Sequence, residues 1–292
     1  MDYLDPKFLR NLERLRMLSR KTFSGNMRGE RKSRKKGASV EFADFTKYNM
    51  GDDFRYIDWN AYARLETLIL KLFMEEEDLL IYILLDSSAS MNYGHPNKHE
   101  FAKKIVAALS YIGTANLDRV KILSFSDHLE EKLPMIRSKS KIYQILDFLK
   151  ELPASGTATH LEQMVDQFLI RHKKPGLCIL ISDFLDPSGY ETSLKKLSYY
   201  LFEPAVIQVF SPEEIQPQYL GDLELRDIET GEKLDLSMNR SAIQHYQATL
   251  KAFCEGLEKF CQTMNILFLR TISATPFEEV VLQYLRRSHF IN

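Results

Sequence analysis

The feature of this sequence that most restricts its fold is a continuous apolar run that ends in a carboxylate, LLIYILLD at residues 79–86. A strand without alternating polar residues must be buried on both faces, and such strands belong to parallel sheets that are covered by helices. The run therefore predicts a central strand of an α/β sheet.

The rest of the chain continues this order of strand and helix. Further strands are predicted at residues 120–125, 177–181, 206–210 and 266–269. Apolar residues three or four positions apart predict helices near residues 101–112, 142–149, 161–169, 240–263 and 276–287. This alternation predicts an α/β fold, a doubly wound and mostly parallel sheet flanked by helices. A hairpin insertion is expected near 222–237, turning at Gly231.

Two parts are expected along the chain, an N-terminal extension at 1–78 and the α/β domain at 79–292. The extension begins with a predicted helix at 4–18. A basic stretch from Arg28 to Lys36 follows, in which six Lys and Arg against one Glu give a local charge of 6 − 1 = +5. Such a stretch is typical of a solvated loop, and a tether to nucleic acid or anionic lipid stays an alternative. The carboxylates and arginines between 52 and 64 are expected to form buried ion pairs, and a second metal or ligand site stays the alternative.

Composition excludes several classes of protein. Hydrophobic residues make up 45% of the chain and the formal net charge is −1, which excludes a disordered chain and a protein that coats nucleic acid. Three cysteines are too few for a dense disulfide framework. The charged N-terminus lacks the apolar core of a signal peptide, and no apolar run is long enough for a membrane helix. We therefore expect a soluble, cytoplasmic protein without a transmembrane segment.

Polar side chains follow two of the predicted strands. The run at 79–86 continues as Asp86-Ser87-Ser88-Ala89-Ser90, in which alternate side chains can converge on one point. Asp183 follows the predicted strand at 177–181, and ligands in open α/β sheets bind beyond the carboxyl ends of the strands. The loop SGTATHL adds Thr157 or Thr159. Oxygen atoms of this kind suit Mg²⁺ or Mn²⁺.

This set of residues resembles the metal-ion-dependent adhesion site of von Willebrand factor A domains. The resemblance implies that the metal ligands are Asp86, Ser88, Ser90, Thr159 and Asp183, with Thr157 as the alternative threonine. It also implies that the hydroxyl groups bind the metal directly, while the carboxylates often act through water. Neutral ligands leave much of the charge of the cation uncompensated, so an open position can accept a carboxylate from a partner protein.

The block that precedes the A-like domain carries a second resemblance. The string GASVEFADFTKYNMGDDFRYIDWNAYARLETLILKLFMEEED, with its Gly-Asp-Asp, Ile-Asp-Trp and Ala-Arg elements, is similar to the signature of the bacterial domain-of-unknown-function 58 family. Members commonly accompany MoxR-type AAA+ ATPases and are thought to serve them as adaptors or co-chaperones. The resemblance therefore implies a MoxR-type ATPase as partner, or a client protein that supplies an acidic residue to the metal.

The sequence gives less support to the hypothesis that this protein is an enzyme. No G-x-S-x-G string, phosphate-binding loop or H-E-x-x-H motif occurs. A metal-dependent phosphohydrolase with Asp86 as nucleophile stays the alternative, although the D-x-D start of such sites is replaced by Asp86-Ser87-Ser88. We therefore expect a non-enzymatic, Mg²⁺-dependent interaction protein and no specific nucleic-acid partner.

Overall fold

The fold is given by a computed structural model of the full chain. It describes residues 41–74, 79–156, 160–217, 221–226, 233–287 and 290–291, together with Leu12, Leu15 and Met17. The chain forms two compact units, a small one from Thr22 to Asp78 and a larger one that holds the remaining residues. Each unit is described by itself.

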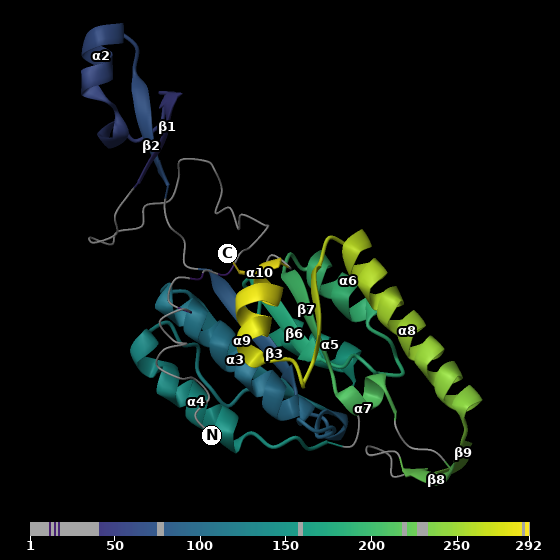
Figure 1. Ribbon diagram of the computed structural model, residues 1–292. Coiled ribbons are helices and arrows are strands. Elements are labelled where there is room, and N and C mark those ends of the chain that lie inside the picture. Colours follow the sequence, from purple (N-terminus) through teal and green to yellow (C-terminus); the bar gives the residue numbers. More distant parts are fainter. Residues whose placement is uncertain are drawn as a thin grey trace. The chain divides into compact units, whose positions relative to one another are not determined.

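A six-stranded sheet forms the centre of the larger unit (Figure 1). Its strand order is β10-β7-β6-β3-β4-β5, with the bounds β3 (Leu80–Asp86), β4 (Arg119–Phe125), β5 (Leu129–Glu130), β6 (Leu177–Ser182), β7 (Glu203–Phe210) and β10 (Leu267–Ile272). Neighbouring strands are parallel except for β5, which pairs with β4 in the antiparallel sense. The predicted mostly parallel sheet is confirmed, and the apolar run at 79–86 is one of its two middle strands.

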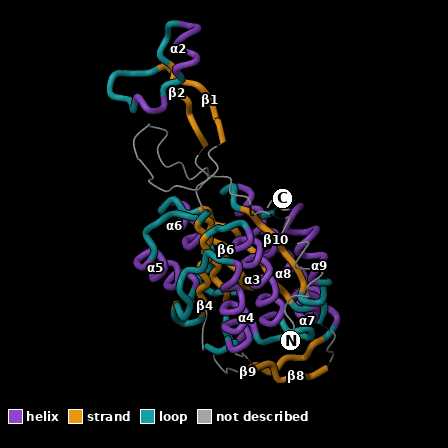
Figure 2. Tube along the Cα trace, turned by 90° about the vertical axis from the view of Figure 1, so that its left-hand side faces the viewer, coloured by secondary structure: helices purple, strands orange, loops and turns teal. Residues whose placement is uncertain are grey.

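Helices cover both faces of this sheet (Figures 1 and 2). Alternate residues of a strand point to opposite faces, and β3 accordingly supplies Ile81 and Ile83 to one apolar cluster and Tyr82 and Leu84 to the other. The first cluster includes α3 (Lys98–Ala115), α4 (Ile142–Glu151) and the C-terminal helical run. The second includes α5 (Leu161–Arg171), α6 (Glu191–Tyr199) and α8 (Arg240–Thr263).

Short elements complete the larger unit. They are the 3-10 turns η2 (Ala89–Met91) and η3 (Lys139–Lys141), helix α7 (Pro212–Ile215), and the antiparallel pair β8 (Gly221–Arg226) and β9 (Lys233–Met238). The C-terminal run consists of α9 (Phe277–Glu279), a π-helical turn at Val280–Tyr284 and α10 (Leu285–Arg287). The pair β8–β9 lies where the sequence predicted a hairpin insertion, and α8 has the bounds expected for the long helix.

The N-terminal part of the chain divides differently from the sequence prediction, which grouped residues 1–78. Leu12, Leu15 and Met17 pack in the core of the larger unit. Met17 forms an isolated bridge with Ile291, and the Asn116 side-chain amide donates to the Leu15 carbonyl oxygen at 2.8 Å. These residues therefore belong with the sheet, although they precede the small unit in sequence. The rest of the predicted helix at 4–18 and the basic stretch Arg28–Lys36 lie outside the described residues.

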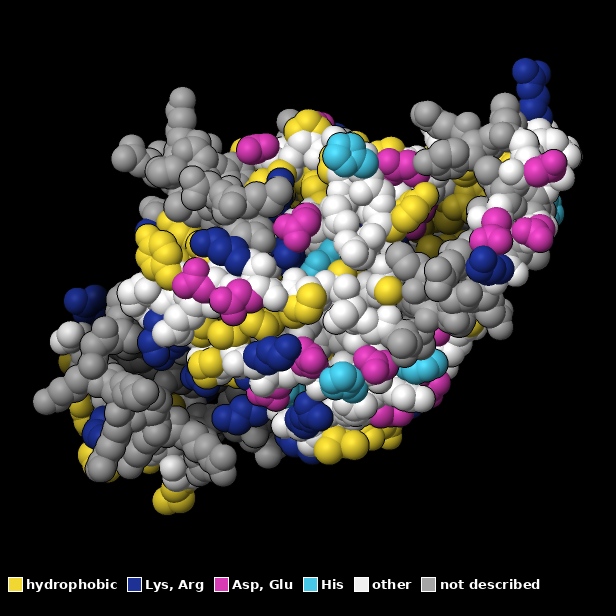
Figure 3. All heavy atoms as spheres, turned by 90° about the horizontal axis from the view of Figure 1, so that it is seen from below, with side chains coloured by type: hydrophobic (Ala, Val, Ile, Leu, Met, Phe, Trp, Pro, Cys, Tyr) yellow, Lys and Arg dark blue, Asp and Glu magenta, His cyan; other side chains and the backbone are white. Residues whose placement is uncertain are grey.

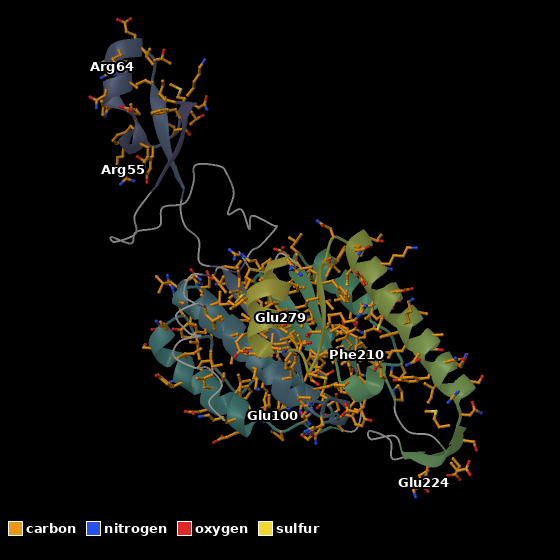
Figure 4. All side chains as sticks on the ribbon, viewed as in Figure 1. Arg55, Arg64, Glu100, Phe210, Glu224 and Glu279 are labelled. Carbon is orange, nitrogen blue, oxygen red and sulfur yellow. The ribbon has the colours of Figure 1, made fainter. Side chains whose placement is uncertain are left out.

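The small unit is built on an antiparallel pair, β1 (Glu41–Lys47) and β2 (Ile69–Met74). Between these strands lie the 3-10 turn η1 (Phe54–Tyr56) and helix α2 (Trp59–Leu65). Figure 4 shows the side chains of Arg55 and Arg64 in this unit. Arg55 pairs with Asp53, but its side chain is 57% exposed, so the prediction of a buried pair is wrong for these two residues.

Cys178, Cys254 and Cys261 are buried free thiols. Burial raises the pKa of the Cys261 thiol to about 12, so this group stays protonated at neutral pH. Within the described part of the chain, no helix is both long and apolar enough to cross a membrane.

Candidate metal centre

The candidate centre lies at the carboxyl edge of the sheet, where two adjacent parallel strands end. Asp86 is the last residue of β3, and Asp183 directly follows β6. The two strands are in register up to the pair Leu85–Ile181, so two residues far apart in sequence reach the same edge. This edge faces downward in Figure 1, and Figure 3 looks onto it, with acidic, basic and histidine side chains interspersed over the described surface.

Asp86 is completely buried and held on both carboxylate oxygens. Its Oδ1 accepts from the Ser88 backbone N–H at 2.9 Å, and its Oδ2 accepts from the Ser182 hydroxyl at 2.5 Å. Burial and the nearby charge of Asp183 raise the pKa of Asp86 to about 7, although these hydrogen bonds act in the opposite direction. The carboxylate is therefore in a place that disfavours negative charge unless a cation compensates it.

The loop after β3 brings two hydroxyl groups together. Both the backbone N–H and the hydroxyl of Ser87 donate to the Phe125 carbonyl oxygen, at 2.8 and 3.0 Å, which fixes the first loop residue to β4. The hydroxyl oxygens of Ser88 and Ser90 lie 2.9 Å apart. Ser88 is buried and Ser90 is partly exposed, so the pair extends from the buried Asp86 toward the surface.

Asp183 binds a buried ammonium group. The Nζ of Lys98 donates to Asp183 Oδ2 at 2.8 Å and to Glu214 Oε1 at 2.6 Å. Burial alone would lower the pKa of Lys98. The charges of Asp183 and Glu214 outweigh this effect, so the pKa is raised. The other Asp183 oxygen, Oδ1, accepts from the Leu185 N–H at 3.1 Å. Lys98 is therefore a charged member of the centre.

The two candidate threonines, Thr157 and Thr159, lie outside the described residues. On the N-terminal side of them, the Ser155 N–H donates to the Ser87 carbonyl oxygen at 2.7 Å. On the C-terminal side, the Leu161 N–H donates to Asp186 Oδ2 at 2.7 Å. Gly156 has a φ of +144° and a Cβ there would lie 2.6 Å from Ser126 Cβ, so glycine is required at that point. The flanking residues are thus attached to the loops that carry Asp86 and Asp183.

The donor set fits a hard divalent cation. Within the described residues, no group of three His, Cys, Asp or Glu side chains could hold a metal; this candidate instead combines two carboxylates with serine hydroxyls. Three carboxylates, those of Asp86, Asp183 and Glu214, stand against the one ammonium of Lys98. Fully ionised, this group has a net charge of −3 + 1 = −2. Without a cation the raised pKa of Asp86 reduces this charge, whereas one divalent cation would compensate the fully ionised group.

Three residues around the predicted ligands were not predicted from the sequence: Lys98 contacts Asp183, Ser182 contacts Asp86, and Glu214 contacts Lys98. Asn97 is the N-cap of α3, with its side chain accepting from the Glu100 N–H, so Lys98 is the first helical residue. A cation at the start of a helix is unfavourable because of the helix dipole. A lysine directly after the N-cap Asn97 is therefore a pattern that could have drawn attention to Lys98. Glu214 completes a Ser-x-x-Glu capping box with Ser211 directly after β7. Ser182 ends β6 beside Asp183 and has no distinctive pattern.

Three comparisons with known proteins place this geometry in context. The model of the family described as "Protein of unknown function DUF58" matches residues 44–253. The match begins in β1 and ends in α8, so it includes parts of both units and all the predicted metal ligands.

A curated relative is the uncharacterized protein Rv1480 of Mycobacterium tuberculosis. It is 23% identical over 242 residues, which cover 82% of this chain and 76% of the relative.

Among solved structures, the chain is similar to the conserved hypothetical protein BatB from Bacteroides thetaiotaomicron, with 17% identity, coverage of 72% of this chain and 98% of BatB, and a TM-score of 0.46. It is also similar to the manganese-loaded TRAP protein of Plasmodium vivax, with 22% identity, coverage of 45% and 57%, and a TM-score of 0.38. At such TM-scores the likeness assigns nothing to this chain, and the fold assignment rests on the strand order of the sheet.

Proposed function

The chain belongs to the DUF58 family, and from this premise we propose that it is a non-enzymatic interaction module whose contact with a partner protein depends on Mg²⁺ or Mn²⁺. The observation that carries the proposal is the pair of buried carboxyl groups, Asp86 and Asp183, at the carboxyl edge of the sheet. Asp86 and Asp183 are buried at adjacent strand ends. Asp86 lies beside Ser88, whose hydroxyl is close to that of Ser90, and Asp183 pairs with the ammonium of Lys98. A divalent cation is the ligand that this arrangement would accept.

Asp86, Ser88, Ser90 and Asp183 would hold the metal, with Thr159 as the fifth ligand. The metal would supply positive charge that a carboxylate of the partner can bind. The protein's own residues fix the donors in place: Ser182 and the Ser88 N–H orient Asp86, and Ser87 fixes the loop to β4. Such preorganisation by neighbouring hydrogen bonds is typical of metal centres in proteins.

We propose a MoxR-type AAA+ ATPase as the partner, or a client protein delivered to it, with this chain as adaptor or co-chaperone. Family membership supports this part of the proposal. A partner that consumes ATP would place the contact in the cytoplasm. The phosphohydrolase alternative finds less support, because Asp86 is completely buried and both of its oxygens accept hydrogen bonds. A nucleophile must instead reach its substrate.

The metal part is tested by Mn²⁺ binding to the full chain, followed by EPR and competition with Mg²⁺. We expect one site in the wild type that is lost in Asp86→Ala and weakened in Ser88→Ala, which removes a hydroxyl without changing charge. Ser140→Ala is the matched control, because the Ser140 hydroxyl is exposed and pairs with the Ser138 hydroxyl at 2.7 Å. Equal Mn²⁺ binding by wild type and Asp86→Ala would contradict the proposed site.

The partner is tested by capture of a MoxR-type ATPase on the immobilised chain, with and without chelator. We expect capture that depends on the metal and is lost in Asp86→Ala. Capture that neither chelator nor Asp86→Ala changes would refute metal-dependent contact. Turnover of phosphoesters with Mn²⁺, lost in Asp86→Asn, would favour the hydrolase instead.

A further inference from the structure

We propose that Lys98 sets the metal affinity of this centre by exchanging its ammonium group between Asp183 and Glu214. The inference rests on the proposed metal-dependent function and adds to it a residue that competes with the metal. Its basis is one buried cation that is shared by two carboxylates, of which only one is a predicted metal ligand.

The position of Lys98 is unfavourable for a cation in two ways. The side chain is completely buried, and burial of an ammonium group is costly unless the group is paired. It is also the first residue of an 18-residue helix, where the helix dipole favours negative charge. Partners within the fold must therefore offset both costs, and removal of a partner changes where the ammonium binds.

The two partners of Lys98 come from different elements, and each is anchored separately. Asp183 follows β6, and its second oxygen accepts from the Leu185 N–H at 3.1 Å. Glu214 lies in α7, and its second oxygen accepts from the Ser211 N–H at 2.7 Å within a capping box. Each carboxylate therefore keeps its position through its own backbone contact when the ammonium moves.

The two contacts differ in what a metal would do to them. A metal ion bound by Asp183 would use the same carboxylate that Lys98 binds. The metal ion and the ammonium group therefore compete for Asp183. Glu214 is outside the predicted ligand set and stays available to Lys98. The ammonium can then keep one close carboxylate, at 2.6 Å, while Asp183 serves the metal. Glu214 thus lowers the cost of releasing Asp183.

This exchange predicts opposite effects on metal affinity when either of the two ion-paired residues, Lys98 or Glu214, is substituted. Lys98→Met removes the competing cation and should tighten Mn²⁺ binding by roughly tenfold, the scale of changes around metal ligands. Glu214→Gln leaves the ammonium dependent on Asp183 and should weaken Mn²⁺ binding by a similar factor, roughly tenfold. Glutamine can still serve at the third position of a capping box, so this variant removes the charge and retains the local turn.

The experiment is a Mn²⁺ titration of the full chain by EPR, with wild type, both variants and Glu213→Gln. Glu213 is the matched control, because it accepts from the His95 N–H at 3.0 Å and does not pair with Lys98. Circular dichroism shows whether each variant is folded, and Lys98→Gln replaces Lys98→Met if the latter does not fold. A metal-induced rise in thermal midpoint gives a second readout, expected to be larger in the Lys98 variant.

Tighter binding in the Lys98 variant together with weaker binding in Glu214→Gln supports the exchange. A loss of affinity in both variants, or no change in either, overturns it while leaving the metal site itself intact. Absence of Mn²⁺ binding in the wild type and in every folded variant overturns the proposed function and this inference with it.

Discussion

The two units of the chain place similar side chains in opposite environments. In the larger unit Tyr82, Phe168 and Phe202 are buried between the sheet and its helices, with ring centroids 5.1 to 5.7 Å apart. In the small unit Phe54 is 68% exposed and Trp59 is 60% exposed. Aromatic content is thus no guide to burial by itself.

The difference arises from the number of layers. Each face of the six-stranded sheet is covered by helices, so both faces of a strand are buried. The small unit has one strand pair, one 3-10 turn and one short helix among its described residues. Ile57 and Leu70 are its buried apolar side chains in the part for which burial is described. A two-stranded ribbon alone is marginally stable in water, so we expect the two units to respond differently to substitution.

The single tryptophan makes this comparison measurable. Trp59 lies in α2 of the small unit, and the sequence contains one Trp. Intrinsic Trp fluorescence therefore reports on the small unit, while far-ultraviolet circular dichroism reports mainly on the helices and sheet of the larger one.

The largest expected effect is in the aromatic cluster of the larger unit. Phe168→Ala removes a ring that contacts Tyr82 and Phe202 edge-on, and should lower the free energy of unfolding by about 3–5 kcal/mol. Denaturant unfolding followed by circular dichroism measures it. The matched variant Trp59→Ala should change the same transition by less than about 0.5 kcal/mol. Equal losses in the two variants would remove the distinction between the units.

The next effect is acid sensitivity of the larger unit. Burial and the charge of Lys103 lower the pKa of His99 to about 3, from the usual 6.5. Below pH 6.5 the unfolded chain therefore binds a proton at His99, whereas the folded chain does not bind it until the pH approaches 3. The stability contributed by neutral His99 is complete above pH 6.5 and is lost as pH falls toward 3, by about 1.4 kcal/mol per pH unit.

His99→Gln should remove this contribution from the pH dependence, as measured by denaturant unfolding between pH 7 and about pH 5, the range in which most carboxylates stay ionised. The control is His245→Gln, which replaces an exposed histidine of α8. Residues 41–74 contain no histidine, so the effect belongs to the larger unit. An unchanged slope in His99→Gln would show that this histidine is not the acid-sensitive group.

A smaller effect is expected at the start of α2. Asp58 Oδ1 accepts from the Asn60 and Ala61 N–H groups at 3.0 and 3.1 Å, so Asp58→Ala should destabilise this helix by about 1 kcal/mol. Asp58→Asn retains an N-cap acceptor and serves as the control. We expect the fluorescence transition to move while the circular dichroism transition stays. Movement of both by the same amount would indicate that the units unfold together.

The smallest effect concerns two helices that end on a left-handed residue. Glu66 ends α2 with a φ of 51°, and Leu201 follows α6 with a φ of 68°. Glycine avoids the steric cost of this conformation but loses more backbone entropy, so each substitution by glycine should stabilise its unit by about 0.5 kcal/mol. Leu201→Ala keeps the steric cost and should give no gain. Destabilisation by either glycine would contradict the expected relief of strain.

Most elements of the larger unit could be predicted because their apolar periodicity agrees with their burial. The strands at β3 and β6 are continuous apolar runs, and α5 carries its stripe at helical spacing. Helix α6 was not predicted, because only Leu194 and Leu197 form its apolar stripe while Ser193 is buried beside them. A helix with so weak a pattern depends on the packing that surrounds it.

The candidate centre was predictable only in part. Asp86 ends a strand, Ser88, Ser90 and Asp183 follow strands, and the strand ends of a parallel sheet meet at one edge. The threonine stays a prediction, because Thr157 and Thr159 are outside the described residues. Lys98 was missed, since its partners Asp183 and Glu214 are 85 and 116 residues away in sequence.

The sequence by itself therefore determined most of the buried strands and amphipathic helices of the larger unit, and which edge of the sheet carries the polar side chains, because these depend on local periodicity and on the direction of parallel strands. Only the tertiary structure decided that Lys98 is buried among carboxylates and that Leu15 and Met17 join the sheet rather than the small unit. The physical reason is that charge pairing and core packing are set by distance in space, which spacing along the chain does not record.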